Sequence, residues 1–252
     1  MGKILVIENH KGGVGKTNLV SNLSAALALM GKTVLMVDLD DLCSLTTSFG
    51  YDPKSFEFSS ASVLQNPASV IKSIYETDIK GLSLMPCSTL MSWVVMELTT
   101  KKDKMTRLQK ALFKVKDLFD YIIIDCSPAL VYSTINALVA ADYLLIPTET
   151  KTQSHLTLPL CLETYNTIRS TTNPNLKFLG VVATLFCCQA REDKEILTEL
   201  GNTYDLLGVI KRSASASKGV KDGEPCVVGQ RKTVVAREYM RIADVLMQKM
   251  EG

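Results

Sequence analysis

The feature that most constrains this chain is a glycine-rich stretch near its N-terminus, residues 8–18. An apolar run at 4–7 precedes it and predicts a buried strand, while residues 19–30, closed by Gly31, predict a helix. A strand, a glycine-rich turn and a helix N-terminus, in that order, form the context of a phosphate-binding loop. The stretch therefore predicts an α/β protein that binds a nucleotide at this loop.

Side chains in this loop are suited to holding phosphate and a divalent cation. Glycines let backbone N–H groups converge on phosphate oxygens, where a side chain would block the approach. Lys16 supplies a positive charge for the β- and γ-phosphates, and the Thr17 hydroxyl suits a Mg²⁺ ligand. The alternative, a glycine-rich turn with two solvated lysines, fits the flanking strand and helix less well. The predicted nucleotide-binding residues are Gly12, Gly13, Val14, Gly15, Lys16, Thr17 and Asn18.

Composition limits the class of protein. A length of 252 residues allows one large α/β domain or two small ones. The 46% hydrophobic content with only 6% aromatic residues suits aliphatic parallel strands covered by helices. Because the formal net charge is +2, any nucleic-acid contact must be a local patch. No apolar run reaches the roughly 18 residues that span a membrane, and the first strand begins too early to leave room for a signal peptide.

The cysteines and histidines give no sign of a metal site. Seven cysteines, without paired spacing and with no C-x-x-C, argue against disulfides and against a zinc or iron–sulfur site. We expect buried free thiols in a reducing cytoplasm. His10 is expected to fill a polar turn, although it could contact the nucleotide or an adjacent loop. Trp93 is expected in the core or at an interface.

Strand-like and helix-like segments alternate along the chain, which predicts a doubly wound, mostly parallel sheet with helices on both faces. We find no linker-like segment, so residues 1–252 are expected to form a single domain. Residues 43–80 are mixed and predict short helices. Further strands are predicted at 32–38, 81–86, 120–125, 143–147, 178–184 and 206–210, and further helices at 101–118, 133–141, 156–170, 192–202 and 232–250.

Carboxylates follow two of these strands, where the functional groups of such a sheet gather. Asp125 ends an apolar run and fits the Walker B position, a carboxylate near Mg²⁺. Asp38 and Asp40 end the second strand and could act on the metal and on water. Taken alone, an aspartate after a strand is more often a turn former, and Asp38, Asp40 and Asp41 could form a solvated loop.

The loop motif departs from the strict G-x-x-x-x-G-K-[ST] pattern, since its first position is His10 and a second lysine, Lys11, follows. With this deviant Walker A motif the chain resembles the ParA/MinD family of P-loop ATPases. The resemblance spans nearly the whole chain and is closest to chromosome-type ParA proteins, often called Soj, at 1–40, 120–150 and 205–235. It implies a Mg²⁺-dependent ATPase with ATP as cofactor, and hydrolysis that is weak without a partner.

The resemblance also assigns roles to three groups of residues. Lys11 matches a lysine that, in relatives, reaches across a dimer interface to the partner's phosphates. This match implies a homodimer in the ATP state. The alternative is that Lys11 only caps the solvent side of the loop. Asp40 matches an aspartate that orients or activates the attacking water. Many relatives follow it with Pro-Gln, whereas this chain has Asp41-Leu42, which puts the loop conformation and hydrolysis rate in question. The implied metal-site residues are Thr17, Asp38 and Asp125.

A late basic loop at 209–221 matches a family segment near the adenine and the DNA-binding face. Arg212 matches a family arginine there, and Ser215 replaces a second one. Arg191 matches another DNA-contact arginine. The resemblance implies salt-sensitive, sequence-independent contacts to double-stranded DNA, although scattered cations on a solvated face are the alternative. The predicted DNA-binding residues are Arg191, Arg212, Lys218 and Lys221, with Arg212 also assigned to the nucleotide.

The expected function is therefore plasmid or chromosome partition by a cytoplasmic, nucleoid-associated ATPase with a ParB-type centromere-binding partner. The last predicted helix carries an apolar stripe typical of core packing, so no membrane contact is expected. One alternative is a MinD-like or cargo-positioning ATPase that acts on a membrane or protein assembly. Another is a metabolic P-loop ligase or kinase.

Overall fold

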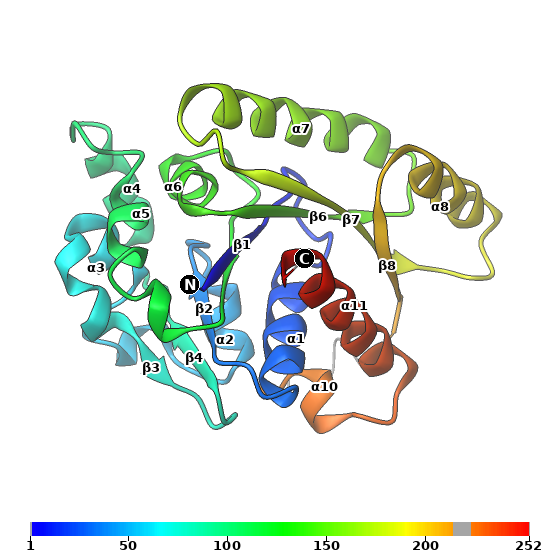
Figure 1. Ribbon diagram of the computed structural model, residues 1–252, viewed down its shortest axis with the longest axis horizontal. Helices are drawn as coiled ribbons and strands as arrows, with labels where there is room; N and C mark the ends of the chain where they lie inside the picture. The colour runs from blue at the N-terminus through cyan, green and yellow to red at the C-terminus, as the bar shows by residue number, and fades with distance from the viewer. Residues whose placement is uncertain (1, 214–222, 252) are drawn as a thin grey trace.

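The computed structural model describes residues 2–213 and 223–251 (Figure 1). One eight-stranded sheet runs through it in the order β3-β4-β2-β5-β1-β6-β7-β8. All neighbouring strands pair in parallel except β3 and β4 at one edge. The strands are β1 Lys3–Ile7, β2 Val34–Asp38, β3 Tyr75–Glu76, β4 Leu82–Met85, β5 Tyr121–Asp125, β6 Tyr143–Glu149, β7 Lys177–Phe186 and β8 Leu206–Lys211.

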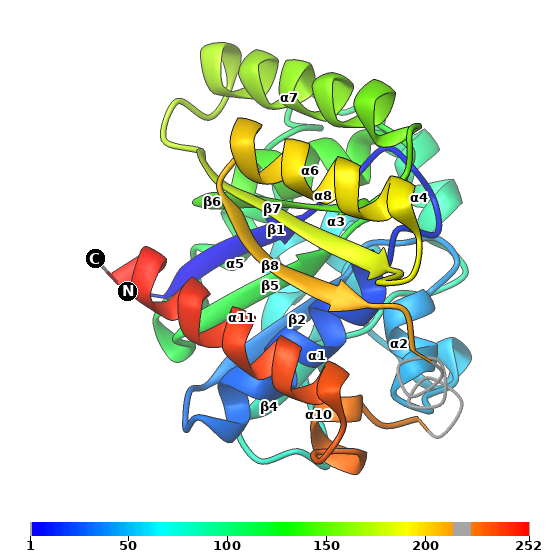
Figure 2. The same cartoon turned by 90° about the vertical axis from the view of Figure 1, so that its right-hand side faces the viewer.

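Helices cover both faces of this sheet (Figures 1 and 2). On one face lie α1 (Lys16–Leu29), α2 (Ser44–Ser48), α10 (Cys226–Gly229) and α11 (Val234–Glu251). The other face carries α3 (Ser60–Gln65), α4 (Met91–Leu98), α5 (Arg107–Leu112), α6 (Tyr132–Ala140), α7 (Ser154–Thr171) and α8 (Arg191–Thr203). Short 3₁₀ turns η1 (Pro53–Ser55), η2 (Pro67–Ser73) and η3 (Lys116–Leu118) connect them. The predicted doubly wound α/β fold is confirmed.

Alternation along the central strand explains why the fold has two cores. In β1, Ile4 and Val6 belong to the core under α5, α6 and α7, whereas Leu5 and Ile7 belong to the core under α1 and α11. Successive side chains of a strand point to opposite faces, so a strand buried on both faces must be apolar at every position. The continuous apolar runs of β1, β2 and β5 are therefore what a central parallel strand requires.

One predicted helix, 101–118, was wrong in extent. Its apolar positions Leu108, Leu112 and Val115 are buried as expected, but α5 covers only Arg107–Leu112 and η3 follows. Arg107 pairs with Asp103 (2.6 Å) and donates to the carbonyl of Leu64 in α3. These contacts tie the start of the segment to another helix in a turn conformation, so tertiary packing overrides the helical pattern.

The predictions for the last helix and for Trp93 had different outcomes. Along α11, Val235, Tyr239, Ile242 and Leu246 are buried in the core, which confirms a core-packing face. Trp93 lies on α4 with 70% of its surface exposed, so it is not a core residue. None of the described helices is both long and apolar enough to cross a membrane.

Candidate nucleotide site

The glycine-rich loop connects the central strand β1 to the start of α1. Gly13 (φ 80°) and Gly15 (φ 86°) adopt the left-handed conformation that side chains disfavour. A Cβ added at Gly13 would meet nothing within 4 Å, so the space beside this residue is open. Because α1 begins at Lys16, its free backbone N–H groups face this space, as an anion site requires.

Lys16 lies at the centre of the loop and is only 7% exposed. Its Nζ donates to the carbonyl oxygens of Asn9 (2.9 Å) and Lys11 (3.0 Å). Asn9 in turn donates from Nδ2 to the carbonyl of Pro147 in β6 (2.7 Å) and accepts from the N–H of Lys11 (2.8 Å). The loop is therefore attached to the neighbouring strand and curves around the lysine amine. Sequence reasoning did not single out Asn9.

A threonine and an aspartate meet below the loop. The Thr17 hydroxyl donates to Asp125 Oδ2 (2.7 Å), and the other oxygen, Oδ1, is buried and has no hydrogen-bond partner among the described residues. Burial, and then the neighbouring charge of Asp38, raises the pKa of Asp125 well above its usual range. An unpartnered carboxylate oxygen beside a threonine hydroxyl fits a hard cation such as Mg²⁺, which takes oxygen ligands.

Asp38 lies directly beside Asp125 in the paired register of β2 and β5. Its Oδ2 accepts from the N–H (2.8 Å) and hydroxyl (2.7 Å) of Thr46, and its Oδ1 accepts from the N–H of Asp40 (3.1 Å). Burial raises its pKa to about 6, against the lowering effect of these bonds. The structure thus shows Asp38 organising the loop after β2, and its metal role stays a prediction.

Asp40 faces a cavity of about 460 Å³ in front of the glycine-rich loop. The side chain is 7% exposed, and burial raises its pKa while the bond from the Leu42 N–H (3.2 Å) lowers it. Leu42 is 76% exposed and borders the same cavity. The cavity is lined by Gly12, Gly13, Gly15, Lys16, Thr17, Asn18, Asp40, Leu42, Ser44, Thr47, Ser48 and Pro128.

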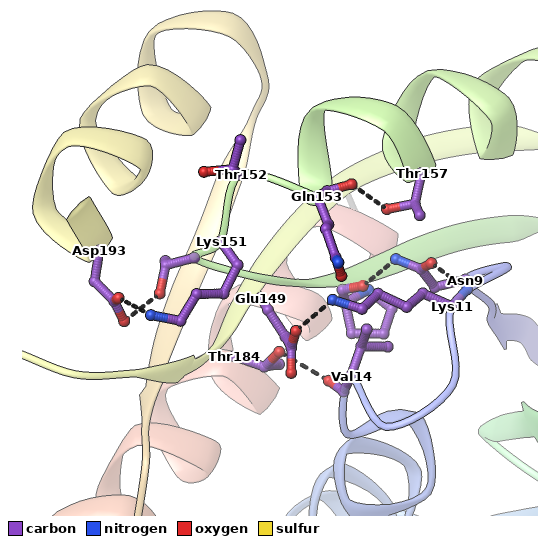
Figure 3. A network of polar contacts seen from close by, with 12 residues as sticks. Asn9, Lys11, Val14, Glu149, Lys151, Thr152, Gln153, Thr157, Thr184 and Asp193 are labelled. Atoms are coloured by element: carbon purple, nitrogen blue, oxygen red, sulfur yellow. Dashed lines mark hydrogen bonds and ion pairs between the residues drawn. The ribbon is translucent and has the colours of Figure 1, made fainter.

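Lys11 is held by a residue of its own chain. Its Nζ lies 2.6 Å from Oε2 of Glu149 at the end of β6, and both side chains are mostly buried (Figure 3). Close by, the Thr184 hydroxyl of β7 donates to the carbonyl of Val14 (2.8 Å) and fastens the loop to a second strand. Sequence reasoning did not single out Glu149, which lies beyond the strand predicted at 143–147.

The predicted DNA-binding residues divide between the described and undescribed parts of the chain. Arg191 starts α8, is almost fully exposed and pairs with Glu195 (2.7 Å). Arg212 follows β8, is exposed, and its N–H donates to the carbonyl of Phe186 (2.9 Å). Arg212 is not among the residues that line the cavity around Asp40. Lys218 and Lys221 lie outside the described residues.

In this site a glycine-rich loop at the start of a helix encloses a lysine amine, and a threonine–aspartate pair lies below it. This arrangement defines a P-loop nucleotide-binding protein. The AAA domain family matches residues 2–178. The chain is 32% identical to the sporulation initiation inhibitor protein Soj of Bacillus subtilis over 96% of this chain and 97% of that protein. It is 30% identical to the chromosome partitioning protein ParA of Caulobacter vibrioides over 96% of this chain and 92% of that protein. This chain therefore belongs to the ParA/MinD family of P-loop ATPases.

A solved structure agrees with this assignment. The cobyrinic acid a,c-diamide synthase of Mycobacterium smegmatis, determined with bound ADP and magnesium, is 30% identical, with a TM-score of 0.86 over 100% of this chain and 96% of that chain. The family predicted from the loop motif is confirmed. The roles of the individual site residues remain predictions.

Proposed function

We propose that this protein is a partition ATPase that cycles between an ATP-bound dimer and a weaker ADP-bound or nucleotide-free state. The observation that carries the proposal is the second lysine, Lys11, at the mouth of a loop whose Lys16, Thr17 and Asp125 are in place for a nucleotide and its metal. Likeness to Soj and ParA over nearly the full length supports it.

In this proposal, the Thr17 hydroxyl and Oδ1 of Asp125 would hold Mg²⁺, which would supply positive charge for the phosphates. Lys16 adds a second positive charge, and neutralising the phosphates is most of what phosphoryl transfer requires of a protein. Asp40, at the wall of the cavity, orients the attacking water. Hydrolysis is expected to be slow in the isolated protein and faster with a partner protein.

The ATP dimer is proposed to bind double-stranded DNA without reading its sequence. Arg191 and Arg212 are exposed beside α8 and β8, where lysine and arginine contacts to phosphates would be salt-sensitive. A ParB-type partner would stimulate hydrolysis and release the dimer. DNA binding would place the protein in the cytoplasm, on the nucleoid.

The decisive experiment measures retention of nonspecific duplex DNA by the purified protein with Mg²⁺ and ATP, ADP or no nucleotide, at two salt concentrations. Retention that requires ATP and weakens at higher salt is expected. Lys16→Ala serves as the control and should lose both nucleotide affinity and DNA retention. Wild-type protein that ignores DNA in every nucleotide state would refute the DNA part of the proposal.

A second candidate, a metabolic P-loop ligase, is favoured by the likeness to the cobyrinic acid a,c-diamide synthase of Mycobacterium smegmatis. Such an enzyme would form ADP in response to a small acid and an amide donor rather than to DNA. Cobyrinic acid with an amide donor is therefore the probe. ADP formation that rises with this pair, and not with DNA and a partner protein, would replace partition by ligation.

A further inference from the structure

Three metal-binding side chains converge behind the glycine-rich loop, outside the residues that line the cavity around Asp40. Glu8 directly follows β1, His10 comes two residues later, and Cys161 lies on α7. One donor atom of each lies within 4.8 Å of the other two. His10 Nε2 is 3.5 Å from Glu8 Oε1. The backbone N–H of His10 donates to Cys161 Sγ (3.4 Å).

Oε1 of Glu8 receives no hydrogen bond from the described residues of this cluster and lies 3.5 Å from His10 Nε2. Glu8 is 1% exposed. Burial raises the pKa of Glu8 to about 7 although Lys16 opposes the rise. Burial, and then the charge of Lys16, lowers the pKa of His10. Burying a carboxylate without a partner costs free energy unless it binds an ion or a proton.

We infer that Glu8, His10 and Cys161 bind one divalent cation of the zinc class, separate from the Mg²⁺ of the nucleotide site. One carboxylate, one imidazole and one thiolate suit Zn²⁺ or Co²⁺, whereas Mg²⁺ and Ca²⁺ prefer oxygen ligands alone. Zinc bond lengths place neighbouring ligand atoms about 3.5 Å apart. The cluster therefore needs an inward shift of about 1 Å to reach a tetrahedral site.

The surroundings complete the case for a cation. Burial raises the pKa of Cys161 to about 12, so formation of a metal–sulfur bond would release the thiol proton to solvent. The carboxylate and the thiolate then cancel the charge of the divalent ion. The Thr164 hydroxyl, also on α7, lies 3.3 Å from His10 Nε2 and adds a polar group where a metal-bound water would need one. The His10 side chain is 20% exposed, which leaves an entry path.

The ion would connect the nucleotide loop to α7. Asn9, whose carbonyl accepts from Lys16, stands between the two ligands Glu8 and His10. A cation bound by Glu8 and His10, and by Cys161 on α7, would hold this part of the loop against α7. We therefore expect Zn²⁺ to raise the melting temperature of the nucleotide-free protein.

The test is a Co²⁺ titration of the full chain, freed of metal by a chelator, without nucleotide and with excess Mg²⁺ to occupy oxygen-only sites. One Co²⁺ per chain is expected, with a thiolate-to-cobalt charge-transfer band that Zn²⁺ abolishes. Cys161→Ser should remove the band, and His10→Gln and Glu8→Gln should weaken Co²⁺ binding about 100-fold or more, since loss of outer-shell partners already costs 10- to 100-fold. Cys188→Ser, on an exposed thiol, is the matched control and should keep the band.

Three results would overturn the inference: no thiolate band in the wild-type chain, a band that survives in Cys161→Ser, or one that disappears in Cys188→Ser. Circular dichroism of each metal-free variant checks folding, and His10→Gln, at a partly exposed position, tests the site independently of the buried cysteine. The readout involves neither ATP nor DNA, so it stands or falls separately from the proposed partition function.

Discussion

At the scale of single residues, the pairing of Lys11 with Glu149 is the contact that bears most on the proposed cycle. The amine that is proposed to reach a partner's phosphates is held 2.6 Å from a carboxylate of its own chain. In the proposed dimer the carboxylate competes with those phosphates for the same charge. The ion pair would then act as a brake on dimer formation.

Glu149→Gln tests this competition. A partly exposed ion pair contributes about 0.2–1 kcal/mol, so its loss should strengthen the ATP-dependent dimer by up to about fivefold. Analytical ultracentrifugation with a non-hydrolysable ATP analogue measures the change. Glu192→Gln, which removes a looser contact to Lys151 (3.8 Å), is the control and should leave the dimer unchanged. A weaker dimer in Glu149→Gln would show that Glu149 assists Lys11 instead.

Asp40→Ala separates binding from hydrolysis. The side chain borders the cavity but makes no contact with Lys16 or Thr17 among the described hydrogen bonds, so ATP affinity and the dimer should persist. Hydrolysis should fall by about 100-fold or more, the usual contribution of a group that positions or activates water. Steady-state phosphate release measures it. Asp52→Ala is the control, because Asp52 is exposed and is not among the residues that line the cavity. Wild-type hydrolysis in Asp40→Ala would refute the role.

At the scale of elements, one buried aspartate fastens the start of α8 to the sheet. Asp193 accepts from the hydroxyl of Thr150 (2.7 Å), from Lys151 Nζ (2.6 Å) and from the N–H of Cys187 (2.8 Å), and Figure 3 shows its contact with Lys151. Arg191 lies two residues before it on the same helix. The position of this arginine, and of any DNA contact that it makes, therefore depends on Asp193.

Asp193→Ala should destabilise the fold by about 2–4 kcal/mol, because it strands a buried N–H, a hydroxyl and an amine. Burial favours the protonated acid, but the bonds from Lys151, Cys187 and Thr150 outweigh it and lower the pKa. The stabilisation is then complete above the unfolded pKa of the acid and is lost as the pH falls through the folded one. Urea unfolding as a function of pH measures both effects. Glu192→Ala, at an exposed neighbouring position, should change stability little.

The contact between β8 and α11 depends on a residue without a side chain. A Cβ on Gly208 would lie 2.4 Å from Cγ1 of Ile242, which is buried on α11. The helix can approach the strand only because this position is glycine.

Gly208→Ala should therefore destabilise the protein by about 1–3 kcal/mol through overpacking. Ile242→Ala alone should cost about 2–5 kcal/mol through a cavity. The double variant should lose less than the sum, since the new methyl group partly fills the space. Denaturant unfolding of all four proteins gives the coupling. Strict additivity would mean that the helix moves aside instead.

At the scale of the whole molecule, strand order determines where the site forms. The carboxyl ends of β1, β2 and β5 lie side by side, with Ile7 and Asp38 both paired to Asp125. Ligands of open α/β sheets bind at such ends, where the connections diverge to opposite faces. The nucleotide site is thus a product of the sheet order, and the dimer that the proposal requires would form over this edge.

Lys11→Ala tests that arrangement. The variant keeps Lys16, Thr17 and Asp125, so ATP binding should remain near the wild-type level. It should lose the ATP-dependent dimer and, with it, DNA retention. Nucleotide binding by fluorescence and mass by light scattering on the same samples separate the two effects. If the variant still forms the ATP-dependent dimer, Lys11 does not act on the partner's phosphates and has a role only within its own loop.

The sequence predicted the fold and the loop because both depend on local patterns. Continuous apolar runs revealed β1, β2 and β5, and the glycine spacing revealed the phosphate-binding loop. The helix predicted at 101–118 was wrong in extent: α5 begins only at Arg107, whose side chain donates to the carbonyl of Leu64, and it ends at Leu112 before η3. The spacing of apolar residues predicts which side of a segment is buried. It does not predict a hydrogen bond to a carbonyl that is distant in the sequence.

The sequence by itself thus determined the fold class and the glycine-rich loop, and it predicted the roles of Lys16, Thr17 and Asp125. Only the tertiary structure decided the partners: Asn9 with Pro147 and Lys11 with Glu149 are each 138 residues apart in the chain. Absence of C-x-x-C argued against a zinc site, yet Cys161 joins His10 across 151 residues. Parallel strand pairing and helix packing bring such groups together in space. Because the intervening connections can vary in length, the spacing of two residues along the chain does not predict that they will be in contact.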